Sequence, residues 1–224
     1  MADYRMQAYT RYAQPVALDY ARYADAYRRR IGQRLVLCAT TRCLDLACGY
    51  GNFLAYLRSA AVEDYTGVDS AQGAVDVARR EFGDERAVCA DVFAYLREAK
   101  AGLDLISALD FLEHLTKGEL FELLDLMRQA LAPNGRLLLR TPNANGLFGM
   151  AARYNDITHE ICFSTGSIAD VLARAGFRTL AVWEDTGRPG TPLQAAHWLA
   201  WQAVRIGIRF VNAAETGRWG DGVL

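Results

Sequence analysis

Three short apolar runs in the first half of the chain each carry an aspartate at or near their end, and this pattern constrains the fold most. The aspartates are Asp45, Asp69 and Asp91. From Arg42 onward, runs of this kind alternate with longer amphipathic stretches, which is the pattern of strand–helix–strand units. Such units build a parallel sheet that binds ligands at its carboxyl edge. The sequence therefore predicts an α/β fold, a Rossmann-like three-layer αβα sandwich with a mostly parallel central sheet.

The same alternation predicts the bounds of the elements. Strands are expected at 42–48, 65–69, 86–90, 103–109, 135–141 and 177–184. Helices are expected between them at 51–60, 71–82, 92–99, 116–131 and 165–175. Three regions follow: an N-terminal helical cap or lid over 1–41, the ligand-binding sandwich over 42–190, and a C-terminal helix and tail over 191–224 packed on the same domain.

Two terminal segments extend the predicted sandwich. Tyr20, Tyr23 and Tyr27 recur at three and four residues and share a helical face. We expect this face to pack on the sheet, with a lid over a ligand as the alternative. The second segment, Pro192 to Glu215, reads as a long helix that is apolar except for a narrow polar stripe. Burial in the core or in a homodimer is expected for it, ahead of a pocket wall or shallow membrane contact.

Charge and cysteine usage exclude several classes of protein. Twenty-five basic and 26 acidic residues give a net charge of −1, which provides no broad attraction for nucleic acid or anionic lipid. No run reaches the ~20 apolar residues of a transmembrane helix, and the N-terminus lacks the apolar core of a signal peptide. None of the five cysteines forms a Cys-x-x-Cys pair. We therefore expect a cytoplasmic protein with reduced thiols, no nucleic-acid partner and no transmembrane segment.

The turn after the first predicted strand has the residues of a nucleoside site. In Cys48-Gly49-Tyr50-Gly51, glycine lets the backbone turn tightly and approach a ligand, and the next helix begins there. Asp69 lies 18 residues beyond Gly51, where a carboxylate can accept hydrogen bonds from ribose hydroxyls. Asp91, at the end of the third strand, can meet an adenine amino group.

This order of residues resembles the seven-stranded S-adenosylmethionine-dependent methyltransferases. The resemblance implies that S-adenosylmethionine is the cofactor, that Asp45 to Gly51 line its methionine moiety, that Asp69 holds the ribose, and that Asp91 with Val92 faces adenine. The implied cofactor-binding residues are Asp45, Ala47, Cys48, Gly49, Tyr50, Gly51, Asp69, Ser70, Asp91, Val92 and Leu109. Ala47 departs from the pattern, which most often has glycine there.

Two alternatives to a methyltransferase remain at this point. A nicotinamide-dependent Rossmann oxidoreductase would need its third glycine where Leu54 stands, and no Tyr-x-x-x-Lys catalytic pair is evident. A protein of the same fold that has lost catalysis would have less reason to keep the glycines and the three aspartates.

A second group of residues follows the fourth predicted strand. If the chain is helical from Asp110, then Asp110, Glu113 and His114 lie on one helical face, and His159 can return to the same sheet edge. These four residues could share a divalent cation. The arrangement is similar to small-RNA 2′-O-methyltransferases and ubiquinone-biosynthesis O-methyltransferases. His114 and His159 are also the candidate catalytic bases, whereas His197 is expected to be structural. In the simplest alternative, Glu113 and His114 only fix the loop through local hydrogen bonds.

The insert between the fifth strand and the next helix, 140–164, resembles bacterial methyltransferases of sugar and polysaccharide biosynthesis. That resemblance implies a small-molecule or saccharide acceptor, and we expect methyl transfer to a small-molecule or glycan-linked hydroxyl, assisted by a base or a metal. Transfer to nitrogen or carbon of another small metabolite is the alternative.

Overall fold

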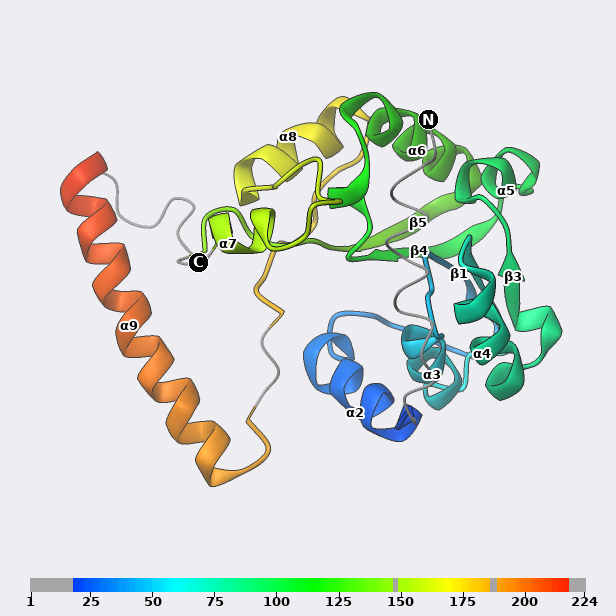
Figure 1. The fold of residues 1–224 in the computed structure, drawn as a ribbon, viewed down its shortest axis with the longest axis horizontal. Helices are drawn as coiled ribbons and strands as arrows, with labels where there is room; N and C mark the ends of the chain where they lie inside the picture. Colours follow the sequence, from blue (N-terminus) through cyan, green and yellow to red (C-terminus); the bar gives the residue numbers. More distant parts are fainter. Residues whose placement is uncertain (1–17, 147–148, 186–188, 218–224) are drawn as a thin grey trace.

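The computed structural model describes residues 18–146, 149–185 and 189–217, and it has a parallel sheet between two layers of helices (Figure 1). The strand order is β3-β2-β1-β4-β5, and every pairing between neighbours is parallel. Because the chain passes from β3 across to the other side of β1, the order reverses between β1 and β4. This arrangement confirms the predicted three-layer sandwich.

The first five predicted strands are confirmed, with small differences at their ends. The strands are β1 (Arg42–Leu46), β2 (Asp64–Asp69), β3 (Ala87–Cys89), β4 (Leu103–Leu109) and β5 (Leu131–Arg140). The described helices are α2 (Tyr20–Ile31), α3 (Asn52–Ser59), α4 (Gln72–Phe82), η1 (Asp84–Arg86), α5 (Val92–Glu98), η2 (Leu112–His114), α6 (Lys117–Ala130), α7 (Gly149–Tyr154), α8 (Thr165–Arg174) and α9 (Pro192–Thr216).

Both faces of the sheet are buried, which explains the apolar character of its strands. Successive residues of a strand point to opposite faces. Cys43 and Leu105 therefore pack in the core beneath α2, α3 and α4, whereas Leu44 and Ile106 pack in the core beneath α5, α6 and α8. The helices exclude solvent from both faces of the sheet, and polar residues are placed at its carboxyl edge.

The predicted sixth strand is wrong. Among the described residues, 177–185 contains no strand and pairs with no neighbour in the sheet. Its apolar side chains are used for packing instead: Phe177 lies against one core and Trp183 against the other. The guanidinium of Arg34 lies 4.6 Å from the centre of the Trp183 ring.

Helix α2 packs on the sandwich through two of the three tyrosines. Tyr27 is buried and meets the Phe53 ring edge-on at 5.3 Å, and Tyr20 meets Phe82 in the same way at 5.1 Å. Tyr23 is exposed. These contacts favour the packing interpretation of the tyrosine face. Of the expected cap over 1–41, residues 1–17 lie outside the described part of the chain.

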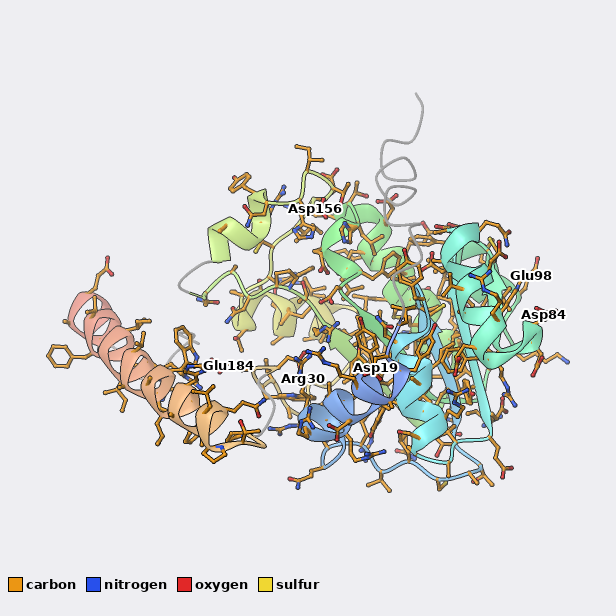
Figure 2. The ribbon with its side chains drawn as sticks, turned by 60° about the horizontal axis from the view of Figure 1, so that its bottom comes forward. Asp19, Arg30, Asp84, Glu98, Asp156 and Glu184 are labelled. Atoms are coloured by element: carbon orange, nitrogen blue, oxygen red, sulfur yellow. The ribbon has the colours of Figure 1, made fainter. Side chains whose placement is uncertain are left out.

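Helix α9 is capped at its start by Thr191, whose hydroxyl accepts from the Gln194 amide. It ends before Gly217, which has a left-handed φ of 69°. The expected packing of this helix on the domain is not observed: α9 stands apart from the sheet and its layers (Figure 1). An ion pair of 2.8 Å joins Arg205 to Glu184, which lies beside it (Figure 2). Across the described residues, no helix combines the length and apolar character needed to cross a membrane.

Candidate functional site

The loop between β1 and α3 takes a left-handed backbone conformation at three residues: Ala47 (φ 54°), Gly49 (φ 53°) and Gly51 (φ 83°). A Cβ at Gly51 would lie 2.6 Å from the Phe82 ring, so that position requires glycine. At Gly49 no atom lies within 4 Å of the place a Cβ would take. The backbone there borders open space, as a loop that approaches a ligand must. Left-handed φ at Ala47 also explains why glycine is preferred there.

Asp69, at the end of β2, ties this loop to the start of α4. One carboxylate oxygen accepts a hydrogen bond from the Gly49 amide and the other accepts one from the Ala71 amide, both at 2.8 Å. Burial raises the pKa of Asp69, and the two amides oppose that rise. Each oxygen has a second lone pair, so the carboxylate can hold the loop and still accept from hydroxyl groups of a ligand.

Asp45 lies inside the sheet and is 2% exposed. Its carboxylate accepts a hydrogen bond of 2.7 Å from the Ser107 hydroxyl, on the residue opposite it in β4. Burial raises the pKa of Asp45 to about 7, although the Ser107 hydroxyl acts to lower it. The carboxyl is therefore shared between its neutral and charged forms near neutral pH.

Asp91 and Val92 have structural roles in addition to their expected ligand contacts. The Asp91 carboxylate caps α5 by accepting from the Ala94 amide at 2.9 Å, and it is otherwise exposed at the sheet edge. Val92 is buried in the core beneath α5. A place at the edge leaves the Asp91 carboxylate open to a ligand, whereas the Val92 side chain is taken up by packing.

The remaining predicted cofactor residues lie on the same edge. Cys48 is buried against Gly67 of β2. A Cβ added at Gly67 would lie only 2.7 Å from the Cys48 sulfur. The Tyr50 carbonyl accepts a hydrogen bond of 2.8 Å from the Tyr20 hydroxyl of α2. Ser70 is exposed beyond β2 and Leu109 is half-buried at the end of β4. The residues predicted to bind the cofactor are thus gathered at the carboxyl ends of β1, β2, β3 and β4.

The helical phase expected from Asp110 is wrong. Asp110 has a left-handed φ of 56°, and the short helix η2 starts only at Leu112. The Asp110 carboxylate is held by two guanidinium nitrogens of Arg140, at 3.0 and 2.6 Å. Arg140 in turn reaches Asp185 at 3.1 Å. Asp110 therefore belongs to an ion-pair network and is not in the cluster formed by the other three predicted ligands.

Those three residues, Glu113, His114 and His159, do come together. One ligand atom from each lies within 4.8 Å of the others, and the two imidazole rings meet edge-on at 4.7 Å. The loop that carries His159 is fixed to η2, because the Glu113 carbonyl accepts from the amides of Glu160 and Ile161. Glu113 is 1% exposed, and burial raises its pKa to about 7. Burial, followed by the nearby His159, lowers the pKa of His114.

His114 is oriented by a relay of hydrogen bonds that starts at Asp156, a residue labelled in Figure 2. The buried Thr158 hydroxyl donates to the Asp156 carboxylate at 2.7 Å and contacts Nδ1 of His114 at 2.8 Å. A hydroxyl has a single proton to donate. Since that proton goes to Asp156, Thr158 accepts from His114, so Nδ1 carries the hydrogen and Nε2 carries the lone pair.

Comparison with known proteins assigns this arrangement to a family. The family model described as a methyltransferase domain matches residues 17–182. The chain belongs to the methyltransferase domain family. A crystal structure of an S-adenosylmethionine-dependent methyltransferase from Archaeoglobus fulgidus is similar to it, with 27% identity, TM-score 0.61, and coverage of 71% of this chain and 70% of that one.

A second structure supports the fold alone. The Thermotoga maritima protein described as a possible histamine N-methyltransferase matches with 15% identity and TM-score 0.54, over 71% of this chain and 76% of that one. No curated protein matches this chain significantly in sequence. The methyltransferase uses S-adenosylmethionine as its methyl donor, and membership of the family removes the nicotinamide-dependent alternative.

Three residues important to this methyltransferase site lie beyond the sequence motifs. Ser107 is buried and bound to Asp45, Thr158 orients His114, and Arg140 holds Asp110. Ser107 is a polar residue within an apolar strand, and Thr158 immediately precedes a singled-out histidine. These two local features are the sequence signals that point to Ser107 and Thr158. Arg140 lies near the end of the strand predicted at 135–141 and is the last residue of β5, but its partner Asp110 lies 30 residues away.

Proposed function

We propose that this methyltransferase transfers the methyl group to a hydroxyl of a small-molecule or glycan-linked acceptor, with His114 as the base that receives the hydroxyl proton. The observation that carries the proposal is the Asp156–Thr158–His114 relay, which leaves the lone pair on Nε2. A hydroxyl must lose its proton during or after attack on the methyl group, and an imidazole with a defined tautomer is suited to accept it.

The protonation states of the cluster support that role. S-adenosylmethionine supplies a methyl group on a sulfonium that is already electrophilic, so the protein has to align the acceptor and remove a proton. Burial and His159 lower the pKa of His114, which keeps the imidazole neutral and able to accept a proton at neutral pH. Once His114 is protonated, the Asp156 carboxylate can stabilise the imidazolium through the Thr158 hydroxyl.

The test separates an orienting role of Thr158 from a merely structural one. Thr158→Val should lower kcat about 10-fold or more, in line with the contribution of general base catalysis, while donor affinity stays unchanged. Thr158→Ser, which restores the hydroxyl, should recover most of kcat. If valine and serine have equal kcat and equal pH profiles, the relay has no part in catalysis.

The acceptor is identified by release of S-adenosylhomocysteine. The panel consists of sugar nucleotides, quinone precursors and phenols, each paired with the analogue in which an amine replaces the hydroxyl. We expect turnover with hydroxyl acceptors and a strong loss with His114→Gln. Turnover confined to the amines would replace this proposal with N-methyl transfer.

A divalent cation at the same cluster is a second candidate, favoured by one observation. Glu113 Oε2 is buried with no hydrogen-bond partner among the residues that the structure describes. An orphaned carboxylate oxygen beside two imidazoles is a donor set that fits a borderline divalent ion. Glu113, His114 and His159 would hold the ion, which would polarise the acceptor hydroxyl as a Lewis acid.

Cobalt absorption tests metal binding without reference to activity. Protein freed of metal is titrated with Co²⁺, and visible absorption bands are expected to appear and to be lost in Glu113→Gln and His159→Ala. Asp110→Asn is the matched control, because Asp110 binds Arg140 and should leave the bands intact. Absence of bands in the unmodified protein would leave His114 as an unassisted base.

The cytoplasmic location is a prediction that the thiols support. All five cysteines are free, and Cys38 is exposed to solvent. Free thiols are typical of reducing compartments.

A further inference from the structure

Helix α9 leaves a stripe of apolar side chains exposed to solvent. Leu199, Ile206 and Phe210 are 61%, 62% and 64% exposed. The partly covered side of the helix carries the polar side chains Gln202, Arg205 and Arg209, together with Trp201 and Ile208. Arg205 binds Glu184, which is labelled next to the helix in Figure 2. An amphipathic helix normally buries its apolar side. The outward-facing stripe therefore needs a cover that the described part of the domain does not provide.

The stripe has a repeat of seven residues. Small residues recur at this spacing in two rows, and a third row carries large apolar side chains. The rows are Ala196 and Ala203, continued by Phe210; Ala200, Gly207 and Ala214; and Leu199 and Ile206. A seven-residue apolar repeat is the pattern of a helix that packs along another helix. Small residues within it let the two backbones approach closely.

We propose that α9 pairs with α9 of a second copy of this chain, antiparallel and centred on Ala203. In that register each large apolar residue meets a small one of the partner helix. The facing pairs are Phe210 with Ala196, Ile206 with Ala200, and Leu199 with Gly207. Both copies contribute the same surface, as a two-fold symmetric interface requires.

The same residues argue against a parallel pair. In a parallel, in-register pair Phe210 would meet Phe210, and Gly207 would meet Gly207. Such a seam is crowded at one place and empty at another, and both defects are unfavourable in a packed interface.

The residues also argue against a lipid surface as the cover. A helix that lies on a membrane has large apolar residues along the middle of its apolar face and Lys or Arg along its polar face. Here the middle of the face carries the small residues Ala196, Ala200, Ala203 and Gly207, and Phe210 is the one large residue in their two rows. Arg205 is turned to the domain, where Glu184 neutralises it. A second copy of α9 fits the observed side chains better than a lipid surface does.

Disulfide trapping tests the orientation and the register together. The full chain carries Cys38→Ser, because the Cys38 thiol is exposed. Ala203→Cys should form a disulfide-linked dimer under mild oxidation. Ala196→Cys alone should not, because its antiparallel copies lie 14 residues or ~21 Å apart along the axis, far beyond the reach of a disulfide. Ala196→Cys mixed with Phe210→Cys should cross-link. Trapping of Ala196→Cys with itself would overturn the antiparallel arrangement.

Light scattering tests the dimer without cross-links. The unmodified chain should have the mass of a dimer, and Ile206→Glu should have that of a monomer with unchanged helix content and S-adenosylhomocysteine affinity. Gln202→Glu, on the covered side of α9, is the matched control and should remain dimeric. A monomeric unmodified chain at every concentration would overturn the proposal, and cosedimentation of that monomer with lipid vesicles would identify a membrane surface as the cover.

Discussion

Replacing Glu113 with glutamine should stabilise the folded protein at alkaline pH and have little effect in acid. The carboxyl is 1% exposed, and one of its oxygens has no hydrogen-bond partner within the described residues. Burial raises its pKa from 4.5 to about 7. The folded state therefore keeps a proton that the unfolded state releases between pH 4.5 and 7. Stability from this group is present below pH 4.5 and is lost as the pH rises through 7.

The size of the effect follows from the shift. The rise in the pKa of Glu113 from 4.5 to about 7 corresponds to about 3 kcal/mol of stability lost at pH 8 and above, and to somewhat less than about 1 kcal/mol at pH 5. Glutamine has the shape of the protonated carboxyl and does not titrate. The free energy of unfolding of Glu113→Gln should thus exceed that of the unmodified protein by about 3 kcal/mol at pH 8 and by less than about 1 kcal/mol at pH 5.

Urea unfolding at pH 5, 6, 7 and 8 provides the measurement. Asp45 also has a raised pKa, but it is present in both proteins and its contribution cancels in the difference. Glu98→Gln, an exposed glutamate of α5, is the control for loss of one charge and should follow the unmodified protein. A stability difference that is the same at all four pH values would refute the reasoning, because it would mean that Glu113 does not titrate with folding.

Three further predictions concern the loop between β1 and α3 and the aspartate that holds it. Asp69→Asn should lower the free energy of unfolding by ~1–3 kcal/mol, because the side-chain amide has one oxygen and cannot accept from both the Gly49 and the Ala71 backbone amides. The same variant should weaken S-adenosylhomocysteine binding in calorimetry, whereas Asp64→Asn, at the other end of β2, should change neither quantity. Ala47→Gly should raise the urea midpoint by relieving ~1 kcal/mol of left-handed strain, and a lower midpoint would contradict this account. Gly51→Ala should lower the thermal midpoint through its clash with Phe82, whereas an unchanged midpoint would mean that the ring moves freely.

The sandwich was predictable because its signals are local. Apolar periodicity, a glycine turn and helix caps each act within a few residues, so five strands and most helices could be placed. The segment 177–184 shows the limit of this reasoning. An apolar run indicates an extended chain, but a strand also needs a partner, and Phe177 and Trp183 are instead used to pack two cores.

The residues of the candidate site could be predicted from the sequence better than the hydrogen bonds and ion pairs between them. Glu113, His114 and His159 were predicted to meet, and the structure brings them together. The prediction that Asp110 joins them is wrong, because its backbone adopts a left-handed φ and its carboxylate is held by Arg140, a partner 30 residues away. Pairings at such separations depend on the order of strands, which periodicity does not encode.

The reversal of strand order between β1 and β4 separates two groups of candidate site residues. Most of the residues proposed to bind the methyl donor follow β1, β2 and β3, on one side of that reversal. The histidine cluster follows β4 and β5 on the other side, where Leu109 of β4, a further proposed donor residue, also lies. The hydrogen bond from the Ser107 hydroxyl to Asp45 connects the two sides, from β4 to β1. Under the proposed roles, substitutions between 110 and 163 change the choice of acceptor and leave most of the contacts with the methyl donor in place. Donor binding and acceptor choice would then be encoded largely by different segments of one chain, on either side of the same sheet.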